Sequence, residues 1–168
     1  MIKGYKCFNK DFTNRYGTKF EVGKTYHCNN EIKFGNNGKG FHMCERLEDT
    51  LRYFDAMDDE VIICEVTGSG NLVEGKDDYY EYYNMYSCEY LTIDKKLSRE
   101  EIRDYGLKLS SYRAKRFVSS YHLNPFELQI FKDKFKYDSD IYKTILYYQE
   151  GQTDIYSKSQ HLIRTKMI

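Results

Sequence analysis

The spacing of apolar and polar positions divides the chain into a first half with strand-like patterns and a second half with helical ones. The clearest strand is EVIICEVTG (60–68), a short continuous run rich in β-branched residues, which is typical of a central strand. GYKCFNKDF (4–12), TKFEVGKTYHC (18–28) and SCEYLTID (87–94) also have the character of short strands, and turn sequences separate them. The first half therefore predicts a sheet.

Two other patterns interrupt this sheet. Residues 45–54 (ERLEDTLRYF) carry apolar side chains at spacings of four and three, which predicts a helix, and GFHMC (40–44) predicts a strand leading into it. FGNNGKG (34–40) and GSGNLVEG (68–75) are rich in Gly and Asn, which favours a loop and a turn.

From Leu97 onward the apolar period becomes helical. Ser98-Arg99-Glu100-Glu101 has the pattern of a capping box at the start of a first helix. Asn124-Pro125 predicts the start of a second helix, with Asn as the cap and Pro at the first helical position. Asp138-Ser139-Asp140 predicts the start of a third, which we expect to stop at Gly151.

Together these patterns predict an α+β fold. Residues 1–96 are expected to form an antiparallel, β-rich domain with one or two helices, and residues 97–168 a helical lobe. The expected boundary lies near Lys95–Leu97. A chain of 168 residues is long enough to build such a core without disulfide bonds.

Composition indicates how this core is filled. Hydrophobic residues make up 40% of the chain and aromatic residues 17%, with 18 Tyr, 10 Phe and no Trp. Aromatic side chains are therefore expected to supply burial that aliphatic ones usually supply. No apolar run approaches the roughly 20 residues of a membrane span, and the N-terminal sequence MIKGYKCFNKDF contains no signal-peptide core. We expect a soluble intracellular protein.

The five cysteines form no CxxC pair and are odd in number, which favours reduced, buried thiols over a disulfide framework. His27-Cys28 and His42-x-Cys44 supply metal-ligand types, but neither has the spacing of a structural zinc site. No metal site is expected.

The formal net charge of zero hides three blocks. Residues 1–54 carry ten Lys or Arg against six Asp or Glu, residues 55–94 carry one Lys against eleven acids, and residues 95–168 carry fifteen against nine. Their net charges are +4, −10 and +6. A strongly acidic block between two basic ones suggests a basic partner.

Tyrosines are concentrated within the acidic block, in GKDDYYEYYNMYSCEYL (75–91). Residues 79–90 fit a helix with most tyrosines on one face, or a strand. Half of these tyrosines are expected in the core, and the alternative for the carboxylates is a solvated face. Clustered acids and Tyr also resemble a nucleic-acid backbone electrically and suit a protein interface. The candidate partner-binding residues are Asp58, Asp59, Glu60, Asp77, Asp78, Tyr79, Tyr80, Glu81, Tyr82, Tyr83 and Tyr86.

The helical lobe offers a different surface. Six basic residues are expected on one helix: Arg99, Arg103, Lys108, Arg113, Lys115 and Arg116. Such a helix could contact nucleic-acid phosphates directly. A solvated basic face, or contact with the acidic block of the same chain, explains the same pattern.

Five short stretches carry a family resemblance. They are Tyr5-Lys6-x-Phe8-Asn9-Lys10-Asp11-x-Thr13, Phe20-Glu21-Val22-Gly23-Lys24-Thr25-Tyr26, Gly40-Phe41-His42-x-Cys44-Glu45, Glu65-Val66-x-Gly68, and Leu91-Thr92-Ile93 through Lys96-Leu97-Ser98. From about Tyr5 to Leu97 the chain resembles a small domain family of unknown function found largely in phages and prophages. The resemblance implies an accessory protein in the cytoplasm of a bacterial host cell. The family has no known catalytic residues that could be assigned to positions of this chain, and we expect no cofactor. Its partner would be a host protein or ribonucleoprotein with a basic groove, as for anti-CRISPR inhibitors of antiphage defence.

Gly38 to Phe54 also resembles, more distantly, the ADP-ribosyltransferase-like fold. That resemblance implies an alternative function as an NAD-using enzyme. Its pocket residues would be Tyr5 on the first strand, His42 on the second, Tyr53 on the helix and Glu89 as the late catalytic glutamate.

Overall fold

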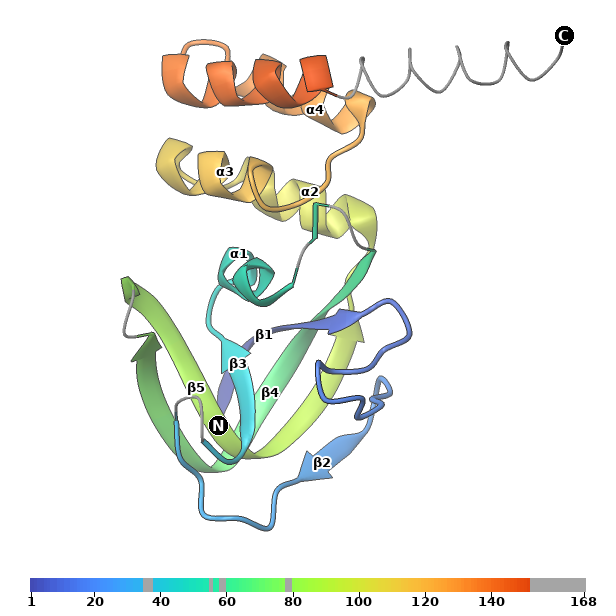
Figure 1. Ribbon diagram of the computed structural model, residues 1–168, viewed down its shortest axis with the longest axis vertical. Coiled ribbons are helices and arrows are strands. Elements are labelled where there is room, and N and C mark those ends of the chain that lie inside the picture. The colour runs from blue at the N-terminus through green and yellow to red at the C-terminus, as the bar shows by residue number, and fades with distance from the viewer. Residues whose placement is uncertain (35–37, 55, 58–59, 78–79, 152–168) are drawn as a thin grey trace, which may run out of the picture. The chain divides into compact units, whose positions relative to one another are not determined.

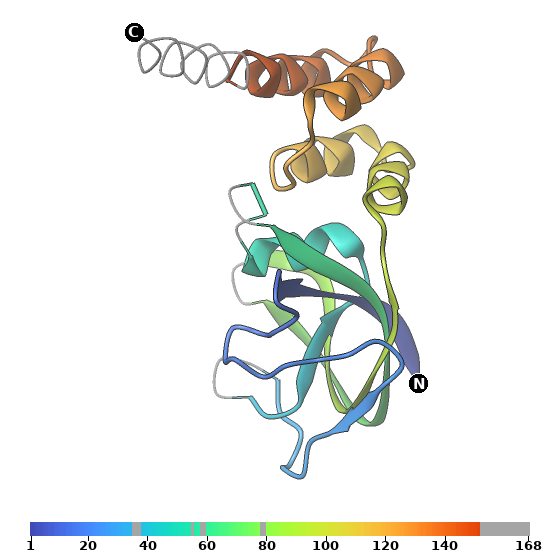
Figure 2. The same cartoon turned by 90° about the vertical axis from the view of Figure 1, so that its right-hand side faces the viewer.

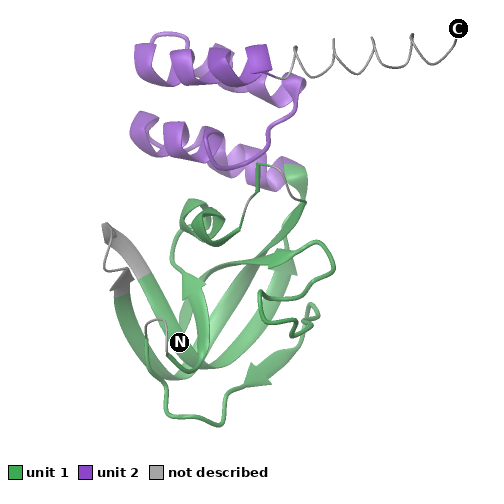
Figure 3. Cartoon of the chain, in the orientation of Figure 1, with its two compact units in different colours: residues 1–99 green, residues 100–168 purple. Residues whose placement is uncertain are grey.

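The computed structural model describes residues 1–34, 38–54, 56–57, 60–77 and 80–151, with the side chains of 76–77 and 80–84 excepted. The chain divides into two compact units, Met1–Arg99 and Glu100–Ile168 (Figure 3). The first unit contains an antiparallel sheet and the second contains helices, so the predicted α+β class is confirmed.

The sheet has five strands: β1 (Ile2–Asn9), β2 (Thr25–His27), β3 (Phe41–Cys44), β4 (Val61–Asp77) and β5 (Tyr80–Lys96) (Figure 1). Their order is β2-β5-β3-β1-β4, and β4 pairs with β5 as well. Because the last strand in this order pairs with an inner one, the sheet closes on itself. Figure 2 shows the closed arrangement from the side.

The hairpin of β4 and β5 is the longest element, with 17 residues in each strand. Its pairing runs from Cys64↔Lys96 to Asp77↔Tyr80, with irregularities that include one between Ser69 and Leu72. The predicted turn at 68–75 is wrong, because these residues continue β4 through that irregularity. Gly70 has a φ of +74° there, a backbone conformation that favours glycine and is common in β-bulges.

The acidic, tyrosine-rich stretch belongs to the same hairpin. Residues 80–96 form β5, so the helical alternative for residues 79–90 is wrong over its described part. The strand EVIICEVTG is confirmed as the first half of β4, where it pairs with both β1 and β5.

Buried side chains fill the interior of the closed sheet. They are Phe8, Phe20, Met43, Cys64, Val66, Cys88, Leu91 and Ile93. Phe20 is fully buried, and its ring centroid lies 5.0 Å from that of Phe8 and 4.6 Å from that of Tyr26. A Cβ on Gly68 would lie 2.8 Å from Sδ of Met43, so this glycine lets the methionine pass close to the backbone.

The predicted helix at 45–54 is confirmed in a shorter form. It consists of α1 (Leu47–Thr50) followed by the 3₁₀ turn η1 (Leu51–Tyr53), and β3 precedes it as expected. Leu47 and Leu51 are buried, and α1 packs against β1 and β3.

The helical unit contains α2 (Arg99–Leu107), α3 (Ser111–Val118), α4 (Pro125–Lys134) and a further helix over residues 139–151. The single basic helix that the sequence suggested is wrong, because Ser110 takes an extended conformation (φ −63°, ψ 156°) as the N-cap of α3. Its six basic residues are therefore divided between α2, α3 and the connection at Lys108.

The start signals of the later helices are confirmed. Asn124 Oδ1 accepts a hydrogen bond from the Glu127 amide at 2.9 Å, and the Asn124 amide donates to Glu127 Oε2 at 2.8 Å. Asp138 caps the next helix by accepting from the amides of Asp140 and Ile141. The helix that starts here is described as far as Gly151, and the predicted stop at this glycine stays a prediction because the residues after it lie outside the described part of the chain.

Stacked phenylalanines hold the helical unit together. Phe117 and Phe131 are both fully buried, with ring centroids 5.9 Å apart. A Cβ on Gly106 of α2 would lie 2.5 Å from Cε1 of Phe117 and 2.8 Å from Cζ of Phe131. The absence of a side chain at Gly106 is therefore a packing requirement.

We expect Gly106→Ala to destabilise the protein. Overpacking a filled core costs about 1–3 kcal/mol, which outweighs the gain of about 1 kcal/mol from replacing a helical glycine by alanine. The thermal midpoint, followed by circular dichroism, should fall. Gly151→Ala is the matched control, because no described atom lies within 4 Å of its added Cβ, and its midpoint should stay level or rise. A midpoint for Gly106→Ala at or above wild type would contradict this packing argument.

Candidate functional site

The acidic block of residues 55–94 lies largely on one element, the β4–β5 hairpin. Among the predicted partner-binding residues, Glu60 and Tyr86 have described side chains. The backbone positions of Asp77, Tyr80, Glu81, Tyr82 and Tyr83 belong to the paired strands, and their side chains lie outside the described part. Asp58, Asp59, Asp78 and Tyr79 lie outside the described residues altogether.

Tyr86 shows how tyrosine and carboxylates are combined where the hairpin is described. It pairs across the strands with Glu74, and its ring packs against the sheet interior. Burial raises the pKa of its phenol, and the charges of Glu74 and Glu45 raise it further. The phenol therefore stays protonated as a hydrogen-bond donor among exposed carboxylates.

Tyr5 on β1 repeats the arrangement. It pairs across the strands with Glu65 of β4 and with Cys44 of β3. Burial raises the pKa of the Tyr5 phenol, with further contributions from Glu65 and Glu48. Half-buried tyrosines beside carboxylates thus recur in the sheet unit.

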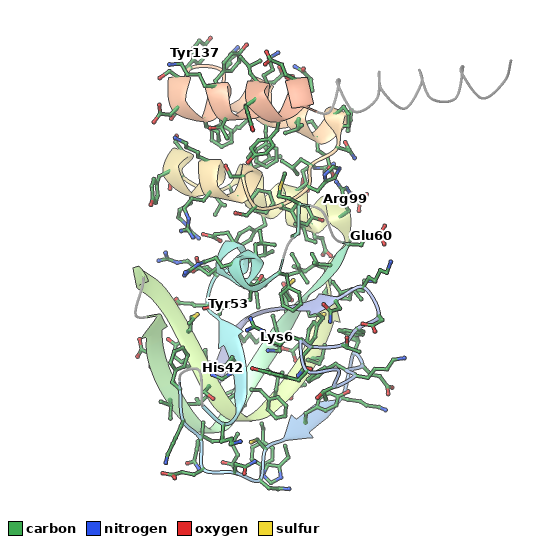
Figure 4. The ribbon with its side chains drawn as sticks, viewed as in Figure 1. Lys6, His42, Tyr53, Glu60, Arg99 and Tyr137 are labelled. Carbon is green, nitrogen blue, oxygen red and sulfur yellow. The ribbon has the colours of Figure 1, made fainter. Side chains whose placement is uncertain are left out.

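His42 lies in a different environment, beside a buried amine. The Lys6 amine donates a hydrogen bond to the His42 carbonyl oxygen, and Figure 4 labels the side chains of both residues. Although Lys6 keeps some exposed surface, burial lowers the pKa of its amino group. Burial, with Lys6 and Arg15 nearby, lowers the pKa of His42 to about 4. The imidazole is therefore neutral near pH 7 and offers no positive charge to a phosphate.

Tyr53 ends η1 close to the same strands. Its hydroxyl lies 2.8 Å from Sδ of Met85 on β5, and the Arg15 guanidinium lies 5.7 Å from its ring centroid. The structure thus places Tyr5, His42 and Tyr53 on neighbouring elements at β1, β3 and η1.

Glu89 has partners on other strands. Its Oε1 lies 3.3 Å from Nε2 of His27 on β2, and its Oε2 accepts from the Asn71 amide of β4 at 3.0 Å. The Asn71 hydrogen bond is the main reason that the pKa of Glu89 is lowered. Both carboxylate oxygens are engaged in joining β2 and the β4 irregularity to β5, which gives Glu89 a structural role.

Four of the five thiols are poorly suited to nucleophilic or metal chemistry. All five cysteines are free, and four are buried. Burial raises the pKa of Cys7, Cys44 and Cys64 to about 12 and that of Cys88 to about 11. Among the described residues no group of three His, Cys, Asp or Glu side chains could hold a metal ion.

Two features of this region have no counterpart among the predictions from the sequence. Glu48 and Asp49 of α1 are buried, at 3% and 1% exposure, and burial lowers the pKa of the Lys6 amine. The charges of Asp49, Lys6 and Glu48 all act on the pKa of the buried Cys44 thiol. An acidic pair in a short amphipathic helix ordinarily indicates a solvated face. The residues around Glu48 and Asp49 contain no pattern from which the burial of these two side chains could be predicted.

One family comparison covers most of the sheet unit and the start of α2. The family described as "Domain of unknown function (DUF7666)" matches residues 2–104. The chain belongs to this family. No curated protein and no solved structure matches the chain. The DUF7666 description names no activity, so the phage and ADP-ribosyltransferase-like resemblances stay predictions. Within the described residues, no helix has both the length and the apolar character to cross a membrane.

The buried imidazole of His42 predicts a pH dependence of stability. Its pKa is about 4 in the folded protein against 6.5 for an ordinary histidine, so the unfolded chain binds more protons between these values. Its contribution to stability is therefore present above pH 6.5 and is lost as the pH falls towards 4. The urea midpoint should fall more steeply over this window in wild type than in His42→Gln.

The control for this experiment is His122→Gln, which replaces an exposed histidine of the helical unit. The quantity compared is the slope of the urea midpoint against pH, because each substitution also shifts the midpoint by an amount that does not depend on pH. Equal slopes for wild type and His42→Gln would show that His42 is not the buried neutral group.

Proposed function

We propose that the protein is a binding module whose acidic, tyrosine-rich β4–β5 hairpin occupies a basic groove of a host protein or ribonucleoprotein. The observation that carries this proposal is the location of the −10 block, eleven acids against one Lys over residues 55–94. Most of this acidic block lies on the β4–β5 hairpin, whose two strands are paired as far as Asp77↔Tyr80.

Folding alone gives little reason for such a concentration of charge. Like charges close together on a hairpin destabilise it, whereas a basic partner would turn the same charges into a favourable field that speeds association. Tyrosine contributes apolar area and a hydroxyl donor at interfaces. The Tyr86 phenol, held protonated between Glu74 and Glu45, is an example within the described part.

The nature of the partner rests on two supports. Clustered carboxylates with tyrosines mimic the charge of a nucleic-acid strand, which suits a groove that normally holds nucleic acid. The resemblance to phage and prophage domains supports a host defence complex as the target, and inhibition by occlusion, as for anti-CRISPR proteins, as the outcome. No cofactor is needed for this function.

The described geometry favours binding over the NAD-dependent alternative. Both carboxylate oxygens of Glu89 are engaged by His27 and Asn71. His42 has a pKa of about 4 and is uncharged near neutral pH. A retained transferase would need a free carboxylate and a phosphate-binding cation at these positions.

The test is a charge-reversed hairpin, Asp77→Lys, Asp78→Lys and Glu81→Lys combined. We expect wild-type protein to capture nucleic-acid-handling proteins from bacterial lysate and the variant to lose about tenfold or more of that capture, since close charge pairs at interfaces contribute several kcal/mol. Quantitative mass spectrometry measures the captured set at low and high salt. Added nucleic acid should release the same proteins, because it competes for the groove.

The matched control reverses three exposed carboxylates outside the block, Glu21→Lys, Glu31→Lys and Asp133→Lys. It changes the net charge by the same amount and should keep the captured set. Circular dichroism checks that both variants fold. Equal loss in both variants, or no loss in the hairpin variant, would refute the hairpin as the contact surface.

A further inference from the structure

The helical unit contains a groove that the hairpin function does not use. Its volume is about 470 Å³, within the range of small-ligand sites. The lining residues are Ser111, Tyr112, Lys115, Arg116, Ser119, Ser120, Asp138 and Asp140.

One wall of the groove is a single face of α3. Tyr112, Lys115, Arg116 and Ser119 follow one another at spacings of three, one and three residues, so they lie along one stripe of the helix and its C-cap. The Tyr112 side chain is 72% exposed. This wall therefore presents an open aromatic ring next to two positive charges.

The opposite wall is acidic. Asp138 is held ionised, because a hydrogen bond from Ser111 and the amides of the following helix lower its pKa. Asp140 Oδ2 lies 3.8 Å from Nζ of Lys115, with side-chain exposures of 78% and 45%. An exposed pair at this distance is weak, so a ligand can exchange for it at little cost. The groove is bipolar, with cations on one side and carboxylates on the other.

We propose that this groove binds one nucleotide unit of a single-stranded nucleic acid. The phosphate lies at Lys115 and Arg116, the base stacks on Tyr112, and the exocyclic amine of the base donates to Asp140. Stacking on an exposed aromatic with a neighbouring cation is how single strands are commonly held. The acidic wall adds a preference for bases that carry an amine, because a carboxylate accepts from the amino group of cytosine and finds no such donor on thymine.

This site is separate from the hairpin in sequence and in chemistry. The hairpin is acidic and is proposed to take a basic protein, whereas the groove takes a strand of nucleic acid. Loss of one activity therefore leaves the other measurable in the same full-length protein.

The experiment is fluorescence anisotropy of the full chain with short fluorescein-labelled oligodeoxycytidine and oligodeoxythymidine. We expect tighter binding to oligodeoxycytidine. Tyr112→Ala should weaken both by about tenfold, the loss of one stacked base. Lys115→Glu should weaken both and reduce the slope of log affinity against log salt by about 0.7, the loss of one phosphate contact on a single strand.

Asp140→Ala gives the sharpest outcome. It should abolish the preference for cytidine while raising the affinity for oligodeoxythymidine, because a repulsive charge near the phosphate is removed. Lys134→Glu on α4 is the matched control, since Lys134 is exposed and lies outside the groove lining, and it should leave the salt slope and the base preference unchanged. Circular dichroism confirms that each variant is folded.

Three results would overturn the proposal. They are no binding of either oligonucleotide at low salt, equal weakening by Lys115→Glu and Lys134→Glu, and a cytidine preference that survives Asp140→Ala. The second result would mean that affinity follows overall charge, and the third that base selection occurs elsewhere.

Discussion

The backbone pairing between β4 and β5 is the constraint on which the sheet unit depends. These strands pair from Cys64↔Lys96 to Asp77↔Tyr80, while β4 also pairs with β1 and β5 with β2 and β3. Removing this contact would open the closed sheet and expose its interior of Phe8, Phe20 and their neighbours. The same strands carry the acidic block, so one element provides both closure of the fold and the proposed contact surface.

Closure also explains why charge is tolerated on this hairpin. The first half of β4 pairs with β1 on one side and with the second half of β5 on the other. Glu89 adds a side-chain link from β5 to Asn71 and His27. The part of the hairpin that pairs with β1, β2 and β3 is therefore stabilised by several strands. This pairing offsets the electrostatic repulsion between carboxylates nearer the turn of the hairpin.

The sequence predicted elements where one physical signal dominated. The β-branched run of 60–68 could hardly be anything other than a buried strand, and Asn124-Pro125 with Glu127 specified a helix start through local hydrogen bonds. Prediction failed where one residue type serves two purposes. Gly70 and Asn71 suit a turn, yet here they form an irregularity within β4, because the pairing of β4 with β5 continues on both sides of them, at Ser69↔Tyr90 and Leu72↔Cys88. The break before α3 was missed because the apolar period of α2 continues through it.

The candidate site also contains features that the sequence predicts and features that it cannot predict. Net charge and tyrosine content drew attention to the hairpin from composition alone. The neutral state of His42 and the engagement of Glu89 could not be predicted, because they result from burial and from contacts with residues of distant strands. The groove on α3 could not be predicted either, because its acidic wall, Asp138 and Asp140, comes from the start of the helix over residues 139–151.

The distribution of the thiols has a practical consequence. Cys7, Cys44, Cys64 and Cys88 are buried and Cys28 is partly exposed, and alkylating reagents react with accessible thiolates. A maleimide dye added to the native protein should therefore attach first at Cys28, without any cysteine being removed by mutagenesis. Since the Cys28 amide bonds the Glu89 carbonyl of β5, a dye at this position would lie at the margin of the sheet and report directly when a large partner approaches it.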